Sequence, residues 1–120
     1  MPDTVANGIR LHYEEAGAGD QAVVFSHSYI LDSEHFRPQI ERLSRGYRCL
    51  AYDHRGHGKS EVAAGGYHMA SLYADAVAFI DATGAAPCHF VGLSTGGFVG
   101  LRNPLRRPEL RRSLVLMDTS

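Results

Sequence analysis

Apolar residues along the chain gather into short runs that predict buried β-strands. Four such runs stand between turn-forming segments, and they cover residues 22–25, 47–52, 88–91 and 113–117. Runs of this kind are typical of strands that are covered on both faces, as in a parallel sheet. Residues 8–14 instead alternate apolar and polar positions, which indicates a strand with one buried face.

Two segments between these runs carry apolar residues at helical spacing. Ser33 is the expected N-terminal cap of a helix over residues 33–43, and Gly46 follows its end. A second helix is predicted over residues 69–83, with Gly84 where a C-terminal cap belongs. The positions expected to face the core are Phe36, Ile40 and Leu43 in the first helix, and Leu72, Ala76 (or Tyr73), Val77 and Ile80 in the second.

The order of these elements predicts the fold class. Strands and helices alternate, and a third helix is expected after residues 92–97, interrupted at Asn103-Pro104 and ended at Pro108. Such alternation predicts an α/β domain with a mostly parallel sheet, helices on both faces in three layers, and right-handed crossovers. The glycine-rich residues 53–66 form a loop within this single domain.

Composition is that of an ordinary globular domain and excludes several function classes. With 44% hydrophobic residues, 21% charged residues and a net charge of −1, the 120-residue chain is too apolar for disorder. The charge balance gives no reason to expect nucleic acid as a partner. No apolar run is long enough to span a membrane, and residues 1–13 lack the apolar core of a signal peptide. We therefore predict a cytoplasmic protein with neither a membrane nor a nucleic-acid partner.

The cysteines and histidines form no metal-site pattern. The two cysteines, Cys49 and Cys88, stand inside apolar runs, which predicts small buried thiols and a reducing compartment. The chain lacks the C-x-x-C and H-E-x-x-H spacings, and His54 and His57 stand in a flexible glycine loop without further ligands nearby. Neither a metal nor a cofactor is therefore expected.

Residues 92–97, Gly-Leu-Ser-Thr-Gly-Gly, match the motif G-x-S-x-G between a predicted strand and a predicted helix. A strand that turns into a helix at one residue strains that residue's backbone and brings the flanking chains close together. Gly92 and Gly96 leave room two positions before and after Ser94, and Gly97 continues the turn. The turn then presents the Ser94 hydroxyl at the carboxyl edge of the sheet, where backbone N–H groups and a helix dipole stabilise an oxyanion.

With this motif in place, the sequence resembles the α/β-hydrolase family over residues 7–120. Residues 26–29, Ser-His-Ser-Tyr, follow the first buried strand, where the family usually carries His-Gly-x-x. Residues 53–60, Asp-His-Arg-Gly-His-Gly-Lys-Ser, match the family's D-x-R-G-x-G-x-S loop, and residues 113–119 resemble the strand after the nucleophile helix. The most similar branch holds lactonases, esterases and cofactor-free haloperoxidases, because Ser94 argues against the Asp nucleophile of epoxide hydrolases and haloalkane dehalogenases.

The resemblance implies a role for several residues. Ser94 is the nucleophile that forms an acyl-enzyme, and the backbone N–H groups of Thr95 and Tyr29 form the oxyanion hole. His27 orders the oxyanion loop, in which Ser28 replaces the family's usual Gly. Further residues are implied as scaffold of a loop near the site, namely Asp53, Arg55, Gly56 and Gly58.

The catalytic triad departs from the family's order of Ser, then Asp or Glu, then His. All seven His precede Ser94, at positions 12, 27, 35, 54, 57, 68 and 89. Asp118, at the end of the last predicted strand, is a candidate for the acid. Because the general base is missing from its expected place, we expect residues 1–120 to be an incomplete α/β-hydrolase core that lacks the lid and the C-terminal strands.

Three interpretations follow from this departure. In the first, the chain is the N-terminal part of a serine hydrolase that acts on small carboxylic esters or lactones, with little or no activity alone. In the second, it is a catalytically dead module that binds a small ligand or a partner, and its last strand is an exposed sheet edge through which self-association can occur. In the third, the base comes from His27, from His54 or from a second subunit. Cofactor-free haloperoxidase or perhydrolase activity is an alternative reaction for the same fold.

Overall fold

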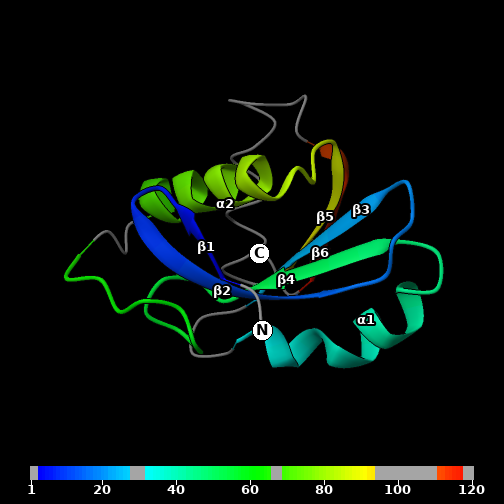
Figure 1. The fold of residues 1–120 in the computed structure, drawn as a ribbon, viewed down its shortest axis with the longest axis horizontal. Helices are drawn as coiled ribbons and strands as arrows, with labels where there is room; N and C mark the ends of the chain where they lie inside the picture. Colours follow the sequence, from blue (N-terminus) through cyan, green and yellow to red (C-terminus); the bar gives the residue numbers. More distant parts are fainter. Residues whose placement is uncertain (1–2, 28–31, 66–68, 94–110, 118–120) are drawn as a thin grey trace.

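A six-stranded sheet organises the computed structural model, which describes residues 3–27, 32–65, 69–93 and 111–117 (Figure 1). The strands are β1 (Asp3–Ala6), β2 (Ile9–Ala16), β3 (Ala22–Ser26), β4 (Arg48–Tyr52), β5 (Cys88–Leu93) and β6 (Arg111–Met117). The helical segments are the 3₁₀ turn η1 (Ser33–Phe36), α1 (Arg37–Leu43) and α2 (Met69–Thr83). The strand order across the sheet is β1-β2-β4-β3-β5-β6.

The sheet is parallel from β4 to β6 and antiparallel at its other end. β3 pairs in parallel with β4 and β5, and β5 pairs in parallel with β6. β1 and β2 are antiparallel to each other, and β2 is antiparallel to β4. Parallel strands of one sheet need a crossover connection. η1 and α1 provide it from β3 to β4, and α2 provides it from β4 to β5, on the other side of β3. The predicted α/β class with a mostly parallel sheet is confirmed.

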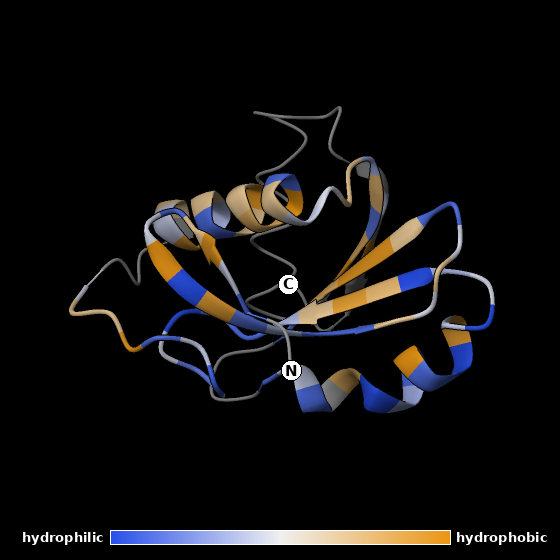
Figure 2. Ribbon diagram, viewed as in Figure 1, coloured by the Kyte–Doolittle hydropathy of each residue, from blue (hydrophilic) through white to orange (hydrophobic). Residues whose placement is uncertain are grey.

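The helices cover opposite faces of the sheet, so the described part has three layers (Figure 1). α2 packs over one face, where Val24, Leu50 and Phe90 belong to its core. η1 and α1 pack over the other face, where Val23 and Cys49 belong to a second core. Successive side chains of a strand point to opposite faces, so wholly apolar strands fill both cores, and Figure 2 shows their hydrophobic central stretches. The predicted layering with helices on both faces is confirmed.

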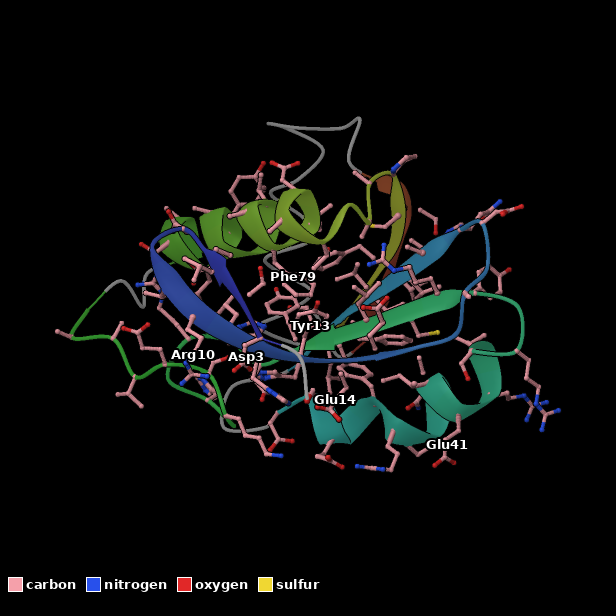
Figure 3. All side chains as sticks on the ribbon, in the orientation of Figure 1. Asp3, Arg10, Tyr13, Glu14, Glu41 and Phe79 are labelled. Carbon is pink, nitrogen blue, oxygen red and sulfur yellow. The ribbon has the colours of Figure 1, made fainter. Side chains whose placement is uncertain are left out.

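The buried face of α2 is wider than its predicted core positions. Leu72, Ala76 and Ile80 are buried as expected, but Phe79 was not predicted and is fully buried. Its ring lies 4.9 Å from that of Tyr52 and 5.1 Å from that of Tyr13. Figure 3 shows Phe79 and Tyr13 between β2 and α2. Gly84 ends the helix with φ +66°, as its predicted role requires.

Both predicted buried thiols are confirmed. Cys49 and Cys88 are free cysteines without exposed surface, one in each core layer. Burial disfavours the charged thiolate, and it raises the pKa of Cys88 to about 12. Burial also raises the pKa of the Cys49 thiol. Both groups are therefore unreactive thiols at neutral pH.

Two local predictions are wrong. Ser33 does not cap the helix, because the Asp32 carboxylate accepts the backbone N–H of Glu34 instead. The backbone N–H of Ser33 donates to the carboxylate of Asp53. The first turn of that helix is the 3₁₀ segment η1. The predicted tight turn over residues 92–97 also starts too early, because Gly92 and Leu93 still pair with β6 as part of β5.

The hairpin of β1 and β2 was missed by the sequence analysis. Asn7 and Gly8 connect the two strands, and both have positive φ angles of +53° and +79°. An Asn-Gly pair with two positive φ angles is the preferred two-residue hairpin turn. The Asn-Gly signal was present in the sequence, but the four residues of β1 are too few and too exposed to show a hydrophobic pattern.

The predicted third helix, with the prolines at 104 and 108, lies outside the described residues. No helix in the described ranges is both long and apolar enough to cross a membrane.

Candidate active site

The carboxyl ends of the central parallel strands bring the motif residues to one edge of the sheet. Ser26, the last residue of β3, lies level with Tyr52 at the end of β4 and with Gly92 in β5. His27 and Asp53 are the next residues along β3 and β4. Two of the loops that the sequence singled out therefore begin side by side.

This edge is also where the direction of the chain connections changes. From β3 the chain continues to β4 on one side, whereas from β5 it continues to β6 on the other side. Ligands of open α/β sheets bind outside the carboxyl ends of strands at such a switch point. β5 ends at Leu93, which precedes Ser94 in the sequence.

A buried hydrogen-bonded group occupies the ends of β3 and β4. Ser26 Oγ lies 3.0 Å from the hydroxyl of Tyr52 and 2.8 Å from Nε2 of His54. The rings of Tyr52 and His54 are stacked, with centroids 5.1 Å apart. Burial, followed by the neighbouring His27 and His57, lowers the pKa of His54 well below its ordinary value. His54 is therefore a neutral imidazole that is held in place by its hydrogen bond.

His27, the first residue after β3, is hydrogen-bonded to the loop after β4. Its Nε2 accepts the backbone N–H of His54 at 2.8 Å, so a neutral His27 carries its proton on Nδ1. The His27 ring centroid lies 4.1 Å from that of His54 and 5.2 Å from that of His57. The Nε2 atoms of His27 and His54 thus both have contacts within this group, which weakens the hypothesis that either imidazole supplies the base to Ser94.

Asp53 holds the loop after β4 together. Its carboxylate accepts the backbone N–H groups of Ser33 at 2.7 Å and of Lys59 at 3.0 Å. Gly58 has φ +51°, and a Cβ there would lie 2.4 Å from the Asp53 carboxylate. Ser60 completes the turn by donating to the Asp53 carbonyl at 2.6 Å. The Asp53 carboxylate and the absence of a side chain at Gly58 therefore together fit the path of this loop.

Arg55 anchors the same loop to α2 through a residue that the sequence analysis missed. Its guanidinium donates two hydrogen bonds to the carboxylate of Asp75, both at 2.7 Å, and a third to the carbonyl of Gly65 at 2.9 Å. Asp75 lies on the buried face of α2, between Leu72 and Phe79 in helical spacing. An acidic residue among the apolar positions of a helix needs a buried partner, and this signal was available in the sequence.

Several predicted site residues lie outside the described residues, so their roles stay predictions. These are the nucleophile and its neighbours, the oxyanion residues and the candidate acid: Ser94, Thr95, Gly96, Gly97, Ser28, Tyr29 and Asp118. Within the described residues, the edge of the sheet brings together His27, Asp53 and Gly92. Arg55 lies in the same loop as Asp53 and is directed toward α2.

The part of the chain that the structure describes contains no group of three or more His, Cys, Asp or Glu side chains placed to hold a metal ion. A cavity of about 210 Å³ lies between β2 and the first helix, on the side where Figure 3 shows Glu14 and Glu41. Ser33, one of the lining residues, donates its backbone N–H to the carboxylate of Asp53. Among the described residues, the lining of this cavity includes neither His27 nor Asp53.

Comparison with known proteins agrees with this architecture. The family model described as the alpha/beta hydrolase fold matches residues 21–120. The chain belongs to the α/β-hydrolase fold family. The matched range runs from the start of β3 to the end of the sequence, so it includes the parallel strands and the serine motif.

Relatives within the α/β-hydrolase family carry several activities in their names. A Variovorax paradoxus protein named as the carbamate hydrolase RutD is 40% identical over 90% of this chain and 42% of its own length. A Mycobacterium tuberculosis protein named as the non-heme bromoperoxidase BpoC is 35% identical over 92% of this chain and 42% of its own length. The enol-lactonase of Burkholderia xenovorans LB400 is a solved structure with TM-score 0.89 and 34% identity, over 94% of this chain and 45% of that one.

These α/β-hydrolase relatives are much longer than the present sequence. The chain spans about two fifths of the length of the curated relatives it matches. The activity, substrate and partners of a whole α/β-hydrolase therefore belong to the proposals that follow.

Proposed function

We propose that Ser94 is the nucleophile of a serine hydrolase that acts on carboxylic ester or lactone bonds through an acyl-enzyme. The observation that carries this proposal is the position of the motif. β5 ends at Leu93 at the carboxyl edge of the parallel sheet, beside the switch point, and Ser94 is the next residue in the sequence, which supports this proposal. A G-x-S-x-G serine in this setting presents its hydroxyl for nucleophilic attack.

The backbone around this position supplies the oxyanion hole in our proposal. The N–H of Thr95 is one donor and the N–H of Tyr29 is the other. His27 contributes by positioning, since it accepts the N–H of His54 and so connects the loop after β3 to the loop after β4. Asp53 and Arg55 stabilise the loop after β4 through their buried hydrogen bonds, Asp53 to Ser33 and Arg55 to Asp75.

In the family's order, the histidine that acts as general base follows the nucleophile. All seven His of these 120 residues precede Ser94, so none of them stands at that place. We therefore propose that the isolated chain is weakly active or inactive. Removal of the base from a serine triad leaves only residual catalysis from the oxyanion hole and binding. The substrate is proposed to be a small molecule, and the two buried thiols support a cytoplasmic setting.

A fluorophosphonate probe tests the nucleophile, with Ser94→Ala as the matched control. Slow labelling that maps to Ser94 and disappears in the variant is the expected result. Absence of labelling at Ser94, even after addition of a separately produced C-terminal half of the enol-lactonase type, would contradict the proposal. Fast labelling of Ser94 in the isolated chain would support its role as the nucleophile. It would contradict the proposal that the isolated chain is weakly active or inactive, since a general base would then be present.

A second candidate is perhydrolase or haloperoxidase activity, which the similarity to the bromoperoxidase favours. This reaction uses the same serine and acetate with hydrogen peroxide, and the peracid oxidises the halide. Bromination of a phenol indicator that needs both acetate and Ser94 supports it, while ester hydrolysis without bromination excludes it.

A further inference from the structure

A second serine–histidine pair lies at the amino-terminal side of the parallel strands. His89 in β5 and Ser113 in β6 are directly opposite each other in the strand register. Nδ1 of His89 lies 2.7 Å from Oγ of Ser113. Nε2 of the same ring lies 2.7 Å from Oε1 of Gln21, the residue before β3. A hydroxyl, an imidazole and a carboxamide thus form one continuous chain of hydrogen bonds.

The Gln21 contact determines which nitrogen of His89 carries the proton. A carboxamide oxygen can only accept, so the Nε2–H of His89 donates to Gln21. The neutral imidazole then has its lone pair on Nδ1, and the hydroxyl of Ser113 donates to that nitrogen. This tautomer is the one that can accept the proton of Ser113 during a nucleophilic attack.

The surroundings hold the imidazole in position while leaving the hydroxyl accessible. The ring of Tyr47 meets the His89 ring edge to face, with centroids 6.0 Å apart and an interplanar angle of 87°. Ser113 is exposed, and both hydrogen bonds of His89 lie at the surface. A small reagent can therefore reach Ser113 from solvent.

We propose that Ser113 is a second nucleophilic hydroxyl, activated by His89 and oriented through Gln21, that takes small activated acyl and phosphonyl compounds. The arrangement contains a nucleophile, its base and a third group that orients the base, which together characterise an activated nucleophile. The site uses none of the residues of the serine motif, so it is independent of the function proposed for Ser94.

The reaction with an aryl ester is an ordinary acyl transfer. Oγ of Ser113 attacks the carbonyl carbon, and its proton passes to Nδ1 of His89. The bond from that carbon to the aryl oxygen breaks, and the imidazolium of His89 returns the proton to the departing phenolate. The products are acylated Ser113, a phenol and a neutral His89. Because the site is open to water, we expect slow stoichiometric acylation rather than rapid turnover.

Residue-resolved labelling tests this proposal in the Ser94→Ala chain, where the other candidate serine is removed. The chain is treated with p-nitrophenyl acetate or a fluorophosphonate, and the modified peptides are quantified by mass spectrometry. Ser44 is the internal control, because its hydroxyl bonds only weakly to the carbonyl of Glu41, at 3.4 Å. General-base assistance typically gives about 10²–10⁴-fold, and at an exposed site we expect Ser113 to react at least about tenfold faster than Ser44.

Two variants separate base catalysis from a contact that only stabilises the strands. His89→Gln keeps a hydrogen-bonding side chain without a base, and it should reduce labelling of Ser113 to the level of Ser44. Gln21→Glu places a carboxylate on Nε2, which makes the imidazole a stronger base, and it should increase the labelling. Melting temperatures confirm that each variant is folded.

Equal labelling of Ser113 and Ser44, or labelling of Ser113 that His89→Gln leaves unchanged, would overturn the proposal and make the pair a cross-strand contact only. The outcome at Ser113 is independent of the outcome at Ser94. In the unsubstituted chain, the two serines lie on different peptides after tryptic digestion, so failure of one proposal is distinguishable from failure of the other.

Discussion

Arg55 and Asp75 form a bidentate ion pair whose side chains are only 8% and 1% exposed. The carboxylate also accepts the side-chain N–H of Asn7 at 2.9 Å. Three segments that are far apart in the sequence therefore meet at one acidic group: the β1–β2 turn, the loop after β4, and α2. Since the loop after β4 carries Asp53, His54 and Gly58, the ion pair fixes the position of these residues of the candidate site.

Replacing Asp75 with Ala should destabilise the chain strongly. The substitution leaves the guanidinium of Arg55 buried without its counterion, and loss of one partner of a buried pair costs about 3–5 kcal/mol. Urea unfolding should show this decrease in the free energy of unfolding. The matched control is Glu34→Gln, which removes the exposed ion pair with Arg37. Exposed pairs contribute about 0–1 kcal/mol, so a similar effect of both substitutions would contradict the role given to Asp75.

The stability of the chain should fall as the pH falls from about 7 to 5. The pKa of His54 is lowered in the folded state, whereas in the unfolded chain an imidazole titrates near about 6.5. Below that pH the unfolded state binds the proton more readily than the folded state, so protonation favours unfolding. The free energy of unfolding should decrease by up to about 1.4 kcal/mol per pH unit for one such group.

Urea titrations at several pH values measure this slope, and His54→Gln isolates the contribution of His54. Glutamine can still hydrogen bond to Ser26 but cannot be protonated, so the slope between pH 7 and 5 should become flatter. Unperturbed Asp and Glu side chains have pKa values of about 4, below this window. An unchanged slope in the variant would show that His54 is not the group that couples folding to pH.

The strands and the long helix could be predicted because their apolar pattern reflects burial directly. α2 covers the predicted residues 69–83, and each predicted strand matches an observed one to within a few residues. β1 could not be predicted in this way, since an edge strand of four residues buries only Ala6. Its pairing is specified by the Asn7-Gly8 turn, a local signal without periodicity, and by the contact of Asn7 with Asp75, a tertiary signal.

The candidate site was predictable at the level of motifs but not of contacts. The motif D-x-R-G-x-G-x-S located Asp53 and Arg55, yet their partners Ser33 and Asp75 come from other elements. The buried link between His27 and His54 likewise depends on the parallel register of β3 and β4. A motif names residues within one segment, whereas these hydrogen bonds join segments that only the folded sheet brings together.

Gly58 should tolerate no side chain. Its φ of +51° is unfavourable for other residues, by about 1–2 kcal/mol, and an added Cβ would lie 2.4 Å from the Asp53 carboxylate. Gly58→Ala should therefore lower the free energy of unfolding by more than about 2 kcal/mol and lower the protection of the Lys59 amide from hydrogen exchange. Gly65→Ala is the control, because a Cβ at Gly65 meets nothing within 4 Å. Comparable effects at both glycines would argue against the close approach to Asp53.

Self-association should occur through β6. Among the described residues, β6 pairs with β5 on one side only, and the side chain of Val115 is 47% exposed. A strand edge with free N–H and C=O groups and an apolar side chain is a template for pairing with another chain. Light scattering after size-exclusion chromatography should show a dimer that dissociates on dilution. Val115→Lys places a charge at that edge and should shift the equilibrium toward monomer, whereas Val62→Lys, at a more exposed position in the loop after β4, should not. A chain that stays monomeric at high concentration, or a dimer that both variants preserve, would show that β6 is not the interface.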